Sequence, residues 1–184
     1  MVNSKDVVVT GVSTGIGHAT TKVLVSKGFR VFGSARKQAD VDRLQKEFGN
    51  GLVPLIMDIT DADAVHQAAQ HVGSLIGDKN LIGLVNNAGI VVSGPLLYLK
   101  PREYRRQLEV NMISPLVVIQ AFAPLLGTDN KRQGPTGRIV NIALALQKLL
   151  FRFSVRIAPP KRAWKQCRTL CGESSCYSAR PCNH

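Results

Sequence analysis

The sequence predicts an α/β fold, a doubly wound parallel sheet with helices on both faces. Short apolar runs alternate with helical segments from residue 7 to residue 142. The runs are mostly apolar, as the buried strands of a parallel sheet are. A glycine-rich turn follows the first run directly, at a point where the chain is expected to pass from strand to helix.

Each predicted element begins or ends at a local signal. Strands are expected at residues 7–10, 30–34, 52–57, 81–85 and 138–142. Helices are expected at residues 15–27, 40–48, 60–76 and 101–122. Asp40 is expected to cap the second helix, and Thr60 or Asp61 the third. Pro101 suits the first turn of the fourth helix, whereas Pro115 predicts a kink or a close-packing point inside it.

Charge divides the chain into two parts. Residues 1–147 carry 16 basic and 11 acidic side chains, a net +5 of the total +12. Residues 148–184 carry 8 basic side chains against the single acid Glu173, a net +7, and hold all four cysteines. This break predicts one domain at residues 1–142, truncated after the fifth strand, and an irregular basic tail at residues 143–184.

The N-terminus does not resemble a signal peptide, because its apolar run is short and leads into the glycine-rich turn. The other apolar stretches are expected to be too short or too interrupted to span a membrane. We therefore expect a cytoplasmic protein.

The turn at residues 10–17, Thr-Gly-Val-Ser-Thr-Gly-Ile-Gly, suits the binding of a pyrophosphate. Gly11 permits a tight turn, Gly15 lets the backbone approach the phosphates, and Gly17 lets the helix pack closely on the sheet. The helix N-terminus adds N–H groups and a positive dipole end. A purely structural turn would also explain the glycines. The candidate cofactor-binding residues here are Gly11, Ser13, Thr14, Gly15, Ile16 and Gly17.

The fourth predicted strand runs into a second motif, Asn86-Asn87-Ala88-Gly89. Together the two motifs resemble those of the short-chain dehydrogenase/reductase family, NAD(P)-binding oxidoreductases with a Rossmann fold. The resemblance covers residues 5–142. It implies that Asn86, Ala88 and Gly89 also contact the cofactor.

The resemblance assigns roles to two further residues. Asp58 matches the family's acidic residue after the third strand, which contacts the adenine ring. Asn111 matches the family's helix asparagine, which positions a proton-relay water and is the one catalytic candidate. A plain neighbour of a helix cap would also explain Asp58, and a buried structural amide would also explain Asn111.

Cofactor choice depends on the end of the second strand. A carboxylate there binds a ribose 2′-hydroxyl, whereas a cation accommodates a 2′-phosphate. This chain has Arg36 and Lys37 at that point, with no acid before Asp40. The planar fork of Arg36 matches a phosphate, so NADP(H) is favoured over NAD(H). A solvated basic loop is the alternative.

The family's catalytic Ser and Tyr-x-x-x-Lys set is absent. No serine follows the fifth strand directly, and none of Tyr98, Tyr104 and Tyr177 has a lysine four residues later. Codons spanning neighbouring residues could nevertheless encode the set: serine at Ala143–Leu144, tyrosine at Arg156–Ile157 and lysine at Pro160–Lys161. We therefore expect an out-of-frame tail from about Ala143.

These patterns predict an oxidoreductase that transfers hydride between an alcohol and a carbonyl but is inactive in this form. A non-catalytic nucleotide-binding protein is the alternative. The apolar run at residues 91–99 predicts a small, lipophilic alcohol or ketone as substrate. Neither a metal site nor a nucleic-acid partner is expected, since the tail lacks paired C-x-x-C motifs and has few aromatic residues. Family-type oligomerisation is expected to be lost.

Overall fold

The computed structural model describes residues 5–94, 96–129 and 131–142. The expected irregular, out-of-frame tail at residues 143–184 lies outside the described residues. The domain boundary at residue 142 therefore stays a prediction.

The described strands form one parallel sheet in the order β3-β2-β1-β4-β5. The strands are β1 (Asp6–Val9), β2 (Arg30–Ala35), β3 (Leu52–Ile56), β4 (Gly83–Asn86) and β5 (Arg138–Asn141). All five lie within one or two residues of the predicted ranges. The order reverses at β1, which pairs with β2 on one side and β4 on the other. This topology confirms the doubly wound fold.

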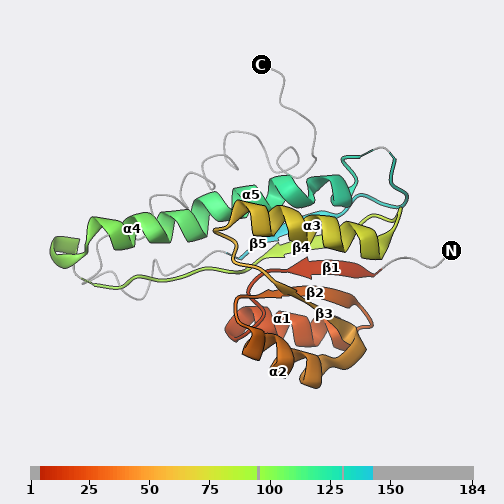
Figure 1. Cartoon of the computed structure of the whole chain (residues 1–184), viewed down its shortest axis with the longest axis horizontal. Coiled ribbons are helices and arrows are strands. Elements are labelled where there is room, and N and C mark those ends of the chain that lie inside the picture. Colours follow the sequence, from red (N-terminus) through yellow and green to blue (C-terminus); the bar gives the residue numbers. More distant parts are fainter. Residues whose placement is uncertain (1–4, 95, 130, 143–184) are drawn as a thin grey trace, which may run out of the picture.

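Helices cover both faces of the sheet (Figure 1). On one face lie α1 (Gly15–Ser26) and α2 (Gln38–Phe48), and on the other lie α3 (Ala62–Ile76) and α5 (Ser114–Phe122). α4 (Pro101–Leu108) continues the line of α5 beyond the sheet (Figure 1). Short 3-10 turns occupy η1 (Gly49–Gly51), η2 (Leu96–Tyr98) and η4 (Ala123–Leu126).

The core has two layers, one on each face of the sheet. In β1, Val7 and Val9 pack in the layer under α1 and α2, whereas Val8 packs in the layer under α3 and α5. This alternation follows from the two-residue period of a strand. Because both faces are covered, all four residues of β1 are buried.

Two predicted helix starts have different outcomes. Asp61 caps α3, because its carboxylate accepts hydrogen bonds from the N–H groups of Asp63 at 3.0 Å and Ala64 at 3.1 Å. The prediction that Asp40 caps α2 is wrong. The helix begins at Gln38, so Asp40 lies inside its first turn, where a carboxylate still stabilises the positive end of the helix dipole.

Just before Pro115, where the sequence predicts a kink, a π turn, η3 (Glu109–Ile113), separates α4 from α5. Pro115 has no N–H to donate to the carbonyl of Asn111, four residues earlier. The Ser114 hydroxyl donates to the Glu109 carbonyl at 2.9 Å, across five residues. The missing N–H of Pro115 and the hydrogen bond of the Ser114 hydroxyl together favour the wider turn at this point.

The expectation that every apolar stretch is too short or too interrupted to span a membrane is wrong for Pro101–Leu126, which is long and apolar enough by length and composition, with 28% of its most apolar window buried. Val118 and Phe122 within it are fully buried in the core. A core helix of a folded domain passes the same test of length and composition.

Candidate functional site

The carboxyl ends of β1, β2, β3 and β4 lie at one edge of the sheet because the strands are parallel. Every candidate residue from the sequence except Asn111 follows or ends one of these strands. Asn111 lies in η3 and reaches the same edge through the segment after β4. The structure therefore brings the candidates to the topological switch point, where α/β sheets bind ligands.

The glycine-rich loop, residues 10–17, leaves the start of α1 open. Gly15 has φ +62°, and a Cβ placed on it would have no heavy atom within 4 Å. Thr14 occupies the cap position without making a side-chain cap bond, and the first turn of α1 contains no acid. The first N–H groups of a helix have no acceptor within the helix, so this terminus suits an anion.

Two glycines of the loop are required by close packing. A Cβ on Gly17 would lie 2.2 Å from the Gly11 carbonyl oxygen and 2.3 Å from Nδ2 of Asn87. Gly11 has φ +70°, and its Cβ would lie 2.9 Å from Cα of Ala88. The first and third glycines therefore let the loop pack against the segment after β4, whereas Gly15 faces open space.

The loop is tied to its neighbours by residues that the sequence analysis did not select. The Thr10 hydroxyl accepts from the N–H groups of Asn87 and Ala88, both at 3.0 Å. Nδ2 of Asn87 donates to the carbonyls of Thr10 and Gly11, both at 2.9 Å. Ser34 of β2 accepts the Gly11 N–H through its hydroxyl at 3.1 Å. The placement of Asn87 directly after a strand, beside the chosen Asn86, was the available signal.

Asn86 and Asn141 end neighbouring strands and face each other. Nδ2 of Asn86 donates to Oδ1 of Asn141 at 2.9 Å. Oδ1 of Asn86 is buried and has no hydrogen-bond partner among the described residues. Asn86 therefore joins β4 to β5 and also places a buried amide oxygen beside the candidate site.

Asn111 is held by the chain segment after β4. Its Oδ1 accepts from the Ile90 N–H at 2.9 Å, and its Nδ2 donates to the Ile90 carbonyl at 2.8 Å. A Cβ on Gly89 would lie 3.0 Å from the same Oδ1. Gln107, one helical turn before Asn111, holds the same segment because its side-chain oxygen accepts the Val92 N–H at 2.6 Å. The side-chain amide of Asn111 thus fixes the path of the backbone from Gly89 onwards.

Asp58 follows β3 and is exposed. It accepts from the Thr60 N–H at 3.0 Å and from the Thr60 hydroxyl at 2.8 Å. The backbone hydrogen bond is the main cause that holds the pKa of the Asp58 carboxyl below its ordinary value of 3.8. The positive charges of Arg36 and Arg106 lower this pKa further.

Arg36 follows β2 and is also exposed. Its side chain makes no hydrogen bond or ion pair with another described residue. The described residues include no group of three or more His, Cys, Asp or Glu able to hold a metal ion. The edge thus combines an open helix N-terminus, a cation and a carboxylate, which fits a ligand with phosphates and a polar ring.

The sequence matches known proteins over most of its length. A short chain dehydrogenase family model matches residues 5–148. An NADPH-dependent 3-dehydrocapnine reductase from Ornithobacterium rhinotracheale is 37% identical over 136 residues, which cover 74% of this chain and 48% of that protein. Human retinol dehydrogenase 5 is 35% identical over 144 residues, covering 78% of this chain and 43% of that protein.

Solved structures agree with this similarity. A short-chain dehydrogenase from Streptomyces avermitilis superposes with a TM-score of 0.68 at 28% identity, covering 77% of this chain and 50% of that one. An NADPH-bound carbonyl reductase from chicken fatty liver superposes with a TM-score of 0.61 at 29% identity, covering 66% and 51%. The chain spans about half the length of these relatives. It belongs to the short-chain dehydrogenase family.

Proposed function

We propose that this chain is the NADP(H)-binding half of a short-chain oxidoreductase and binds the dinucleotide without turning over a substrate. The observation that carries the proposal is the open N-terminus of α1, with Gly15 facing space and no side chain capping the helix. The first-turn N–H groups would hold the pyrophosphate. A bound nicotinamide supplies the hydride in this class of chemistry.

The preference for NADP(H) rests on Arg36. Its guanidinium has no partner among the described residues and lies near enough to Asp58 to lower the pKa of that carboxyl. A phosphate on the ribose would supply a charge-matched, two-point acceptor for Arg36. Two relatives support this choice, since one is named for NADPH dependence and another was solved with NADPH bound.

Arg36→Asp tests the preference. We expect NADP⁺ affinity to fall about tenfold or more and NAD⁺ affinity to change little, measured by titration calorimetry. Lys22→Asp on α1 is the control, because it also reverses an exposed positive charge. Equal losses of affinity for NADP⁺ and NAD⁺ would show that Arg36 does not bind the 2′-phosphate.

The absence of turnover follows from the residues after β5. The family's Ser and Tyr-x-x-x-Lys set is not found in residues 143–184. Without it, the chain lacks general acid–base catalysis, which typically raises the rate by roughly 10²–10⁴. We propose that this segment is an out-of-frame reading of a catalytic half that acts on a small, lipophilic alcohol or ketone. Neither a nucleic-acid partner nor a membrane span is proposed, and the location proposed is cytoplasmic.

Restoring the frame from Ala143 tests the catalytic proposal. We expect the 184-residue chain to bind NADPH but not to consume it with ketones or aldehydes, and the restored chain to do both. If the restored chain binds NADPH yet reduces none of a broad carbonyl panel, the protein is a nucleotide-binding protein rather than an enzyme. Turnover by the 184-residue chain itself would contradict the proposal directly.

A further inference from the structure

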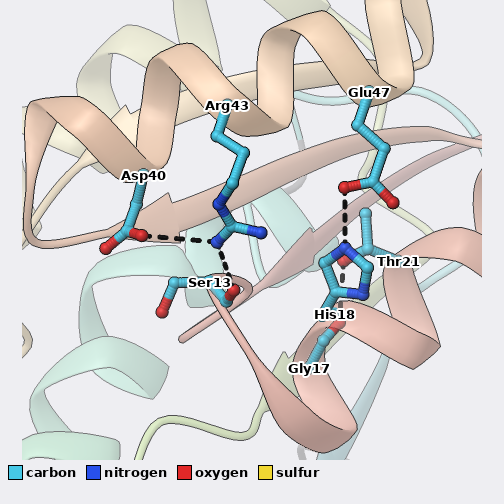
Figure 2. A network of polar contacts seen from close by, with 7 residues as sticks. All are labelled: Ser13, Gly17, His18, Thr21, Asp40, Arg43 and Glu47. Atoms are coloured by element: carbon cyan, nitrogen blue, oxygen red, sulfur yellow. Dashed lines mark hydrogen bonds and ion pairs between the residues drawn. The ribbon is translucent and has the colours of Figure 1, made fainter.

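α2 contacts the glycine-rich loop and α1 through two charged side chains (Figure 2). Arg43 reaches Ser13 in the loop, and Glu47 reaches His18 in the first turns of α1. The two residues lie four positions apart on α2, so both point from the same face of the helix. We call this pair of contacts the α2 strap.

The Arg43 contact acts on the backbone of the loop. Its Nη2 donates to the Ser13 carbonyl at 2.6 Å and lies 3.3 Å from the Asp40 carboxylate. The Ser13 carbonyl and the Thr14 N–H belong to one planar trans peptide, in which they point in opposite directions. By drawing the carbonyl towards α2, Arg43 directs the Thr14 N–H away from α2.

The Glu47 contact holds the helix that follows the loop. Its Oε2 lies 2.9 Å from Nε2 of His18, whose ring also packs against Phe48 with centroids 5.3 Å apart. Gly17 lies directly before His18, and its carbonyl accepts the Thr21 hydroxyl at 2.9 Å. The strap therefore fixes the loop at Ser13 and α1 at His18, on either side of Gly15.

We infer that Arg43 is a positioning residue for the dinucleotide pyrophosphate, because it sets the orientation of the Ser13–Thr14 peptide at the start of α1. This inference rests on the proposed function. Arg43 acts through the loop rather than as a ligand, since the nitrogen nearest the loop already contacts Ser13 and Asp40. Its effect must then be common to NADP(H) and NAD(H), which share the pyrophosphate.

Arg43→Ala and Arg43→Lys test the inference, with Lys46→Ala as a matched control on an exposed position of α2. NADP⁺ and NAD⁺ affinities are measured by calorimetry, and backbone amide exchange in the loop is measured without ligand. We expect Arg43→Ala to weaken both dinucleotides by a similar factor, about fivefold to tenfold, and to speed exchange at Thr14. Lysine keeps the positive charge and can also donate to the carbonyl, but it lacks the planar guanidinium that orients the donor, so Arg43→Lys should recover part of both losses.

The outcomes separate this inference from the proposed function. Unchanged affinities in Arg43→Ala overturn the inference, and a loss confined to NADP⁺ overturns it too, because Arg43 would then bind the 2′-phosphate. If the wild-type chain binds neither dinucleotide, the proposed function fails. Exchange at Thr14 in the ligand-free chain then decides whether Arg43 holds the loop. Melting temperatures of both variants identify any loss of affinity that comes from unfolding.

Discussion

The two ends of the parallel sheet use their charged and polar groups in opposite ways. At the amino end, Arg30 makes two hydrogen bonds with the buried Asp6 carboxylate, at 2.7 and 2.9 Å. Arg132 donates to the carbonyls of Gly77 and Lys79, closing the end of α3. At the carboxyl end, by contrast, α1 begins without a side-chain cap. Polar groups of the amino end stabilise the fold, and several of the carboxyl end remain available to a ligand.

The glycines of the carboxyl end divide in the same way. Gly17 has no room for a side chain, because Gly11 and Asn87 occupy the space. Gly15 has room but needs a positive φ. A substitution at Gly17 should therefore act on folding, whereas one at Gly15 should act mainly on binding.

Gly17→Val is expected to have the largest effect on stability. Its Cβ would meet backbone and side-chain atoms at 2.2–2.3 Å, so α1 must move away from the segment after β4. We expect the free energy of unfolding to fall by about 3 kcal/mol or more. Urea unfolding followed by circular dichroism measures it, and a stability within 1 kcal/mol of wild type would contradict the described packing.

Asp6→Ala should lower stability by about 1–2 kcal/mol without changing dinucleotide affinity. The substitution removes the buried partner of Arg30, whose side chain is 40% exposed and can turn towards water. Urea unfolding gives the stability, and calorimetry at a temperature where the variant is folded gives the affinity. Weaker binding by the folded variant would mean that the two ends of the sheet are not independent.

Much of this comparison could be predicted from the sequence, because it depends on local patterns. Apolar runs located the five strands, and Gly11, Gly15 and Gly17 located the loop. The hydrogen bonds that Asn87 and Arg43 make to the loop could not be predicted, because each joins residues far apart in the chain and depends on the register of packed elements. The start of α2 was also missed, because no side chain caps it and Asp40 stabilises the helix from inside the first turn.

Gly15→Ala should cost about 1 kcal/mol of stability, since an alanine at φ +62° is strained while its methyl group meets no neighbour. We expect a larger effect on binding, with both dinucleotides weakened about fivefold to tenfold, because the methyl group holds the pyrophosphate away from the backbone. Gly49→Ala, at the C-terminal end of α2, is the control, with φ +51° and equally open space. Equal affinities in the two variants would remove the special role of Gly15.

The smallest effect on stability should come from Asp58, as a change in how stability depends on pH. Its pKa is lowered in the folded state, so it stabilises the fold above its ordinary pKa of 3.8, and this contribution disappears as pH falls through the lower folded value. Between about pH 5 and pH 3, wild type should therefore lose more stability than Asp58→Asn. Parallel urea titrations across this interval measure the difference, and identical pH profiles would show that the Thr60 contacts contribute nothing to stability.

The central claim is that the carboxyl end of the sheet is a dinucleotide site and the amino end is structural. Backbone amide exchange of the 184-residue chain, with and without NADP⁺, tests it most directly. The account predicts added protection from Gly11 to Gly17, at Arg36 and from Asn86 to Gly89, with none around Arg30, Gly77 or Lys79. Protection spread equally over both ends, or none at Gly15 in a chain that calorimetry shows to be saturated with NADP⁺, would contradict it.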